Sequence, residues 1–147
     1  AYAATTFTPD VRPSMRVALE EVAARSSDGA ALLIDAPGPE RFEGASEPLD
    51  RVAGHIPGAV NHFYKWNLGE DGTMLPPSAL RERFERLLAG RPPESAVMYC
   101  GSGVSACHNL LAMEHAGLPG TKLYPGSWSE WSSDPERPVE TGLPRHG

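Results

Sequence analysis

The sequence is poor in cysteine, which excludes a fold held together by disulfide bonds. Its 147 residues include only Cys100 and Cys107, too few for a disulfide framework. The first ends an apolar run and the second lies about two turns along the next expected helix, so they are on the order of 10 Å apart, beyond disulfide reach. We therefore expect two free thiols in a reducing compartment, most simply the cytoplasm.

Long apolar runs and clusters of basic residues are also missing. No apolar stretch approaches the length of a membrane-spanning helix, so we expect no membrane partner. The formal net charge is −6, and no basic run is interleaved with aromatic residues, so we expect no nucleic-acid partner. The opening AYAATTFTPDVRP has neither the basic start nor the apolar stretch of a signal peptide. We interpret residues 1–14 as a linker and residues 15–147 as one compact domain.

What is present is an alternation of strand and helix patterns, punctuated by 15 glycines and 15 prolines. The expected strands are the apolar run AALLIDAP, a short AVNHF, SAVMYC and TKLYPG. The first expected helix begins near Leu19 and ends at Asp28. The second covers PPSALRERFERLLAG, with Ser78 as its cap, and the third covers GVSACHNLLAMEHAG. A short helical turn is expected in SWSEWSSDP. The long polar segment PGPERFEGASEPLDRVAGHIPGA is expected to be a surface loop.

This alternation predicts an α/β fold, with a central parallel sheet and helices on both faces. Ligands of such sheets bind beyond the carboxyl ends of the strands, and Cys100 stands at one of these ends. Gly101 and Gly103 let the chain curl so that successive N–H groups point inward, and the next helix adds its positive end. Both effects lower a thiol pKa and hold an anion beside the sulfur. The alternative is a small, inert, buried cysteine.

Three motifs in the right order make the chain resemble rhodanese-like sulfurtransferases. They are RFEG, AGHIPGAVN, and CGSGVSA with VMY before it and LYPGSWSEW after it. More narrowly, the chain resembles the catalytic C-terminal domain of two-domain 3-mercaptopyruvate/thiosulfate sulfurtransferases. The resemblance implies an N-terminal rhodanese domain as a partner in the parent chain.

In this family the cysteine carries sulfur, so the resemblance makes Cys100 a nucleophile that becomes a persulfide. It takes sulfane sulfur from a small anionic donor and passes it to a thiol, to cyanide or to a thioredoxin-like protein, with no metal or organic cofactor. The resemblance also implies that the loop amides cradle the persulfide; this substrate-binding loop comprises Gly101, Ser102, Gly103, Val104, Ser105 and Ala106.

The sequence of the same loop also indicates which sulfur donor the protein uses. In this family, a loop with basic residues after the cysteine is associated with thiosulfate, whereas a Gly-Ser-Gly loop is associated with 3-mercaptopyruvate. Ser102 matches the hydroxyl residue that helps to polarise the mercaptopyruvate thiol, and Ser105 stands where threonine is commoner. We therefore expect mercaptopyruvate as the donor, with thiosulfate as the alternative.

Four further residues are implicated by the resemblance. Arg41 matches a position that binds the donor's carboxylate or sulfonate, and Arg51 is expected to add a supporting contact. Trp128 is expected to wall the pocket, and Asp35 to orient the loop by accepting amide hydrogens. The family usually has Asp-x-Arg after the first strand, whereas this chain has Asp-Ala-Pro from Asp35 to Pro37.

Two other functions compete with this interpretation. A Cys-x5-Arg phosphatase needs an arginine where this chain has Ala106. A non-catalytic module, or a persulfide relay that needs a partner domain or protein, is the alternative of a different class. We expect His55 to be structural, because the histidine spacing matches no metal-ligand pattern. We also expect Cys107 to be a packing residue and His108 to face solvent.

Overall fold

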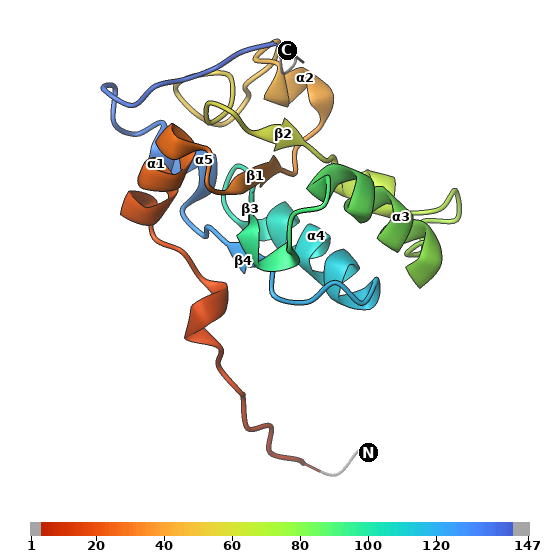
Figure 1. Ribbon diagram of the computed structural model, residues 1–147. Helices are drawn as coiled ribbons and strands as arrows, with labels where there is room; N and C mark the ends of the chain where they lie inside the picture. Colours follow the sequence, from red (N-terminus) through yellow and green to blue (C-terminus); the bar gives the residue numbers. More distant parts are fainter. Residues whose placement is uncertain (1–3, 143–147) are drawn as a thin grey trace.

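A computed structural model describes residues 4–142 of the chain (Figure 1). Residues 1–3 of the expected linker and residues 143–147 of the expected domain lie outside the described residues. The chain from residue 4 to Arg12 is exposed and has no regular structure, and Figure 1 shows it extending away from the body of the molecule. A short 3-10 helix, η1 (Pro13–Met15), follows, and Val17 is the first buried residue that the structure describes.

The centre of the molecule is the parallel sheet that the sequence predicts. Its strands stand in the order β2-β1-β3-β4, and every neighbouring pair is parallel. The strands are β1 (Leu32–Asp35), β2 (Val60–Asn61), β3 (Ala96–Tyr99) and β4 (Lys122–Leu123). The two central strands are buried along their whole length, which explains why both read as continuous apolar runs.

Helices cover both faces of the sheet, as the alternating pattern predicts (Figure 1). On one face, Ala96 and Met98 of β3 pack with the apolar side chains of α3 (Pro77–Leu88) and α4 (Val104–His115). On the other face, Val97 and Tyr99 pack with α1 (Leu19–Asp28) and α5 (Ser127–Trp131). Successive side chains of a strand point to opposite faces, so β3 supplies both cores.

Two local expectations were wrong. Ser78 does not cap α3: the helix begins at Pro77 with Pro76 at the cap, and no side-chain cap bond is made. Proline suits the first position because its missing N–H has no partner there in any case. The long polar segment between β1 and β2 is also not loop throughout, since it contains the short helix α2 (Pro39–Phe42). This helix buries Phe42 completely and carries Arg41 beside it.

Two short 3-10 helices, η2 (Tyr64–Asn67) and η3 (Pro93–Ser95), were not expected from the sequence. The first follows β2 and packs against α4. It brings Tyr64 and Asn67 close to the helix that follows the cysteine loop.

Candidate active site

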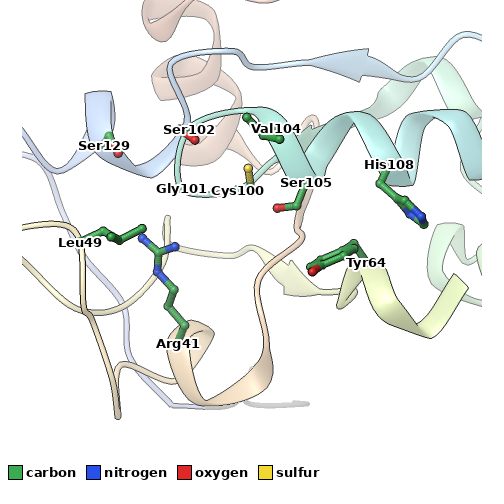
Figure 2. A pocket seen from close by; sticks show the side chains of 10 residues that line it. All are labelled: Arg41, Leu49, Tyr64, Cys100, Gly101, Ser102, Val104, Ser105, His108 and Ser129. Atoms are coloured by element: carbon green, nitrogen blue, oxygen red, sulfur yellow. The ribbon is translucent and has the colours of Figure 1, made fainter. Parts of the chain in front are cut away.

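Cys100 stands where β3 gives way to α4, at the carboxyl end of the central sheet. The side chain is 3% exposed, but it lines a cavity of about 540 Å³ (Figure 2). Gly103 caps α4 with a φ of 84°, a left-handed conformation that an L side chain adopts only at a cost. The Gly-x-Gly sequence after the cysteine is therefore a turn that feeds directly into a helix N-terminus.

The start of α5 holds the outside of this turn. The Trp128 amide donates to the Cys100 carbonyl at 2.8 Å, and the Ser129 amide donates to the Gly101 carbonyl at 2.9 Å. The Ser127 hydroxyl oxygen accepts from the Cys100 amide at 3.2 Å. With these carbonyls engaged by α5, the amides further along the turn are free to face the sulfur.

The inside of the turn supplies hydrogen bonds to the sulfur. The Gly103 amide donates to Cys100 Sγ at 3.1 Å. Burial raises the pKa of the Cys100 thiol, but bonds from the Ser105 hydroxyl and from the amides of Ala106, Ser102 and Gly103 outweigh it. The pKa of Cys100 therefore lies below its ordinary value, which makes the sulfur a thiolate more readily.

The remaining two residues of the loop lie elsewhere around the site. Val104 is 76% exposed and forms part of the rim of the cavity. Gly101 faces Arg41: a Cβ at this glycine would lie 2.9 Å from the Arg41 Nη1 atom. Only a glycine fits at this approach without displacing the guanidinium.

Arg41, which the resemblance implicates in donor binding, lines the cavity, but its charge is already shared. Its Nε donates to Glu47 at 2.8 Å and its Nη2 donates to Asp50 at 2.9 Å. The side chains of Glu47 and Asp50 are only 5% and 14% exposed. These bonds fix the guanidinium plane and leave Nη1 directed at the cysteine loop.

Asp35 lies under the site and does not make the expected contacts with loop amides. It is buried, and its Oδ1 atom has no hydrogen-bond partner among the described residues; the nearby Tyr99 hydroxyl and Ala36 amide lower its pKa only in part. The Tyr99 hydroxyl oxygen in turn accepts from the Ile56 amide at 3.1 Å. Burial, followed by the nearby Cys100, raises the pKa of Asp35 well above its ordinary value. A neutral carboxyl under the thiolate avoids placing two negative charges together.

The two other candidates lie away from the main cavity. Trp128 is buried and donates from Nε1 to the Val52 carbonyl at 2.8 Å. It borders a narrow void beneath Cys100 that it shares with Asp35 and Arg41. Arg51 is exposed and does not line the cavity.

The structure corrects the expectations for two residues on α4 and shows further residues that line the cavity. His108 was expected to face solvent, but it is half-buried and lines the cavity with Tyr64, Leu49 and Ser129. Cys107 was expected to be a packing residue, but it is exposed. The sequence could have indicated that His108 lines the cavity, since it is three residues after Ser105 and lies on the same face of α4.

His55 is structural, as predicted. It is fully buried and stacks on Phe42 with ring centroids 3.7 Å apart, and its Nδ1 lies 2.7 Å from the Phe42 carbonyl oxygen. Among residues 4–142, no group of three or more potential metal ligands is found. No helix within this part of the chain is long and apolar enough to cross a membrane.

Comparisons with known proteins agree with this geometry. The family model described as rhodanese-like domain matches residues 18–134. A probable 3-mercaptopyruvate sulfurtransferase of Pseudomonas aeruginosa is 58% identical over 110 residues, which are 75% of this chain and 39% of that protein. A putative thiosulfate sulfurtransferase of Mycobacterium tuberculosis, SseB, is 44% identical over 138 residues, 94% of this chain and 47% of that protein.

A solved structure is also similar. The crystal structure of the Tum1 protein from Saccharomyces cerevisiae matches with a TM-score of 0.71 and 32% identity, over 86% of this chain and 47% of that one. The matched part of the chain thus covers less than half the length of each of these three relatives.

Proposed function

The chain belongs to the rhodanese-like domain family, and on that premise we propose that it is the catalytic domain of a sulfurtransferase in which Cys100 carries sulfane sulfur as a persulfide. The observation that carries the proposal is the Cys100 sulfur itself. It faces an open cavity and accepts hydrogen bonds from the loop, so its pKa is lowered. A thiolate in such a ring of donors is suited to attack sulfur.

In the first half-reaction, the Cys100 thiolate attacks the sulfur of 3-mercaptopyruvate. A sulfur–sulfur bond forms and the carbon–sulfur bond of the donor breaks. Its electron pair leaves on the carbon as pyruvate enolate, which takes up a proton to become pyruvate. The loop donors that stabilise the thiolate also suit the terminal sulfur of the persulfide.

In the second half-reaction, an acceptor nucleophile attacks the outer sulfur of the persulfide. The sulfur–sulfur bond of the persulfide breaks, and its electron pair returns to Cys100 as a thiolate. Cyanide would leave as thiocyanate, and a thiol would leave as a hydropersulfide. A thioredoxin-like protein supplies the same nucleophile in a larger partner. No metal or organic cofactor enters either step.

The charges around the cavity favour mercaptopyruvate over thiosulfate. Gly101 and Ser102 stand where a basic pair would serve a dianion, and the Arg41 charge is already paired with Glu47 and Asp50. The carboxylate of mercaptopyruvate needs only one guanidinium edge, whereas thiosulfate brings two charges to a cluster whose own net charge is negative. Since relatives carry both names, thiosulfate is the alternative donor.

The whole protein's activity is proposed to need more than this chain. The relatives are about twice its length, which supports a second rhodanese domain in the parent, joined through residues 1–14 to the catalytic domain at 15–147. The two free thiols support a reducing compartment, the cytoplasm.

The proposal is tested by sulfur transfer to cyanide, measured with each donor in turn, and by the mass of the protein after donor treatment. We expect turnover with mercaptopyruvate and the gain of one sulfur atom on Cys100. Cys100→Ser should abolish both results. The matched control is Cys107→Ser, because Cys107 is exposed and lies outside the cavity. If neither the wild-type chain nor its parent transferred sulfur from either donor, the hypothesis of a non-catalytic module would replace the proposal.

A further inference from the structure

A network of polar side chains runs from the core to the cavity wall, and the sulfur-transfer steps above do not use it. Asn67 and Asn109 are fully buried, and His62 is 6% exposed. Half-buried His108 ends the network, beside Tyr64, where both line the cavity. The rings of Tyr64 and His108 meet edge to face with centroids 5.5 Å apart.

The direction of every hydrogen bond in this network follows from one backbone carbonyl. Asn109 Nδ2 lies 2.9 Å from the His62 carbonyl oxygen, which can only accept, so the amide nitrogen of Asn109 must face it. The Asn109 Oδ1 atom then faces Asn67 at 2.7 Å. That oxygen also can only accept, so the Asn67 atom facing it is the donor Nδ2.

The rest of the network is then determined. With Nδ2 of Asn67 assigned, its Oδ1 accepts from His62 Nε2 at 2.9 Å. Burial lowers the pKa of His62, and a neutral ring with its proton on Nε2 fits this bond. The second hydrogen of Asn67 Nδ2 points to His108 Nδ1 at 3.3 Å. That ring nitrogen must offer a lone pair, so a neutral His108 carries its proton on Nε2.

His108 also stands on the side of the cavity that the donor leaves free. Figure 2 shows Arg41 and Leu49 on one side of Cys100, and Tyr64 and His108 on the other. If the donor's carboxylate binds at Arg41, the His108 side remains for a second molecule. Its surface there combines one aromatic wall with one N–H donor.

We propose that His108, held by Asn67 as the Nε2–H tautomer, is the hydrogen-bond donor of an acceptor subsite, where it binds a carboxylate or carbonyl oxygen of an organic thiol acceptor. This inference rests on the proposed sulfurtransferase function. His108 is a donor here and not a base, because Asn67 occupies its lone pair and its other nitrogen already carries a proton. The thiol therefore attacks the persulfide as a thiolate formed in solution, and His108 orients it through its polar end.

The first test needs no turnover. Nitrogen-15 spectra of the histidine rings, assigned with the His108→Gln variant, should show an unprotonated Nδ1 and a protonated Nε2 at His108. Asn67→Asp replaces the donor with a carboxylate that only accepts, and it should move the proton to Nδ1. A wild-type His108 with its proton on Nδ1 overturns the proposal, whether or not the Asn67 variant folds.

The second test compares two thiols that differ in the group His108 would bind. The probes are 3-mercaptopropionate, which has a carboxylate, and 2-mercaptoethanol, which has none. In His108→Phe, the ratio of kcat/KM for the first thiol to that for the second should fall about tenfold, the effect of one lost bond to a charged group. His108→Gln keeps an N–H donor and should retain most of the ratio. An unchanged ratio in His108→Phe overturns the proposal.

A binding measurement separates this inference from the proposed function. In Cys100→Ser, which cannot transfer sulfur, 3-mercaptopropionate should shift the His108 Nε2–H resonance and 2-mercaptoethanol should not. A shift with both thiols, or with neither, refutes the subsite. Absence of sulfur transfer in both the wild-type chain and its parent would refute the proposed function and leave this readout to decide the subsite.

Discussion

Replacing Gly103 by alanine should both destabilise the fold and weaken the sulfur nucleophile. Gly103 has a φ of 84°, and a Cβ there would lie 2.8 Å from the Pro125 carbonyl oxygen. The left-handed conformation costs an L residue about 1–2 kcal/mol. Overpacking against fixed backbone adds about 1–3 kcal/mol. We therefore expect the free energy of unfolding to fall by about 2–5 kcal/mol, a large part of the stability of a single domain.

A second glycine in this chain isolates the contact with Pro125. Gly72 has a φ of 77°, but a Cβ there would meet nothing within 4 Å. Gly72→Ala should therefore cost only the backbone term of about 1–2 kcal/mol. The difference between the two variants in urea unfolding then measures the close approach of the cysteine loop to the segment before α5.

The same substitution should be visible in the chemistry of Cys100. The Gly103 amide donates to the Cys100 sulfur at 3.1 Å, and moving the loop away from Pro125 lengthens that bond. The pKa of Cys100 should rise, and its alkylation rate at neutral pH should fall, in Gly103→Ala but not in Gly72→Ala. The reasoning is refuted if the two alanine variants are equally stable, or if the pH profile of Cys100 alkylation is the same in both.

Three other outcomes are expected. Iodoacetamide should label Cys100 faster than Cys107 at neutral pH, because loop hydrogen bonds lower the pKa of Cys100, whereas partial burial and then the nearby Cys100 raise that of Cys107. Equal rates by peptide mass analysis would contradict this. Because burial raises the pKa of Asp35, the folded state keeps a proton that the unfolded chain releases, so stability falls as pH rises above the ordinary aspartate range. In urea unfolding measured across pH, Asp35→Asn should reduce this fall of stability with rising pH. The prediction is refuted if the stability of the variant and of the wild type depends on pH in the same way. Phe84→Ala should cost about 3–5 kcal/mol in the same assay, since Phe84 is fully buried under the sheet, and a loss below about 1 kcal/mol would be inconsistent with this packing.

The charge of Arg41 is shared with two neighbouring carboxylates. Glu47 and Asp50 hold the guanidinium so that Nη1 faces the cysteine loop. The pKa of Glu47 lies below its ordinary value, because the bonds from Arg41 and from two amides outweigh the effect of burial. Arg41 therefore acts as an oriented hydrogen-bond donor more than as an unshielded positive charge.

The sequence by itself determined the features that depend on local pattern. Apolar runs identified β1 and β3, the helical period identified α3 and α4, and the glycines after Cys100 identified the turn at the helix N-terminus. Each of these follows from backbone geometry over a few consecutive residues, which is why it is readable without a structure. The parallel pairing of the strands followed from their alternation with helices, whereas the order of the strands came from the structure.

Only the tertiary structure decided which distant side chains meet at the cysteine. The amides of α5 that hold the Cys100 turn, and Asn67, which contacts His108, come from segments far away in the sequence. Their positions depend on how the two cores pack against the sheet, and no local periodicity encodes that packing. His108 illustrates the difference. Its place on a helix was evident from the sequence, but its role at the cavity wall depends on Asn67, which the fold brings beside it from η2.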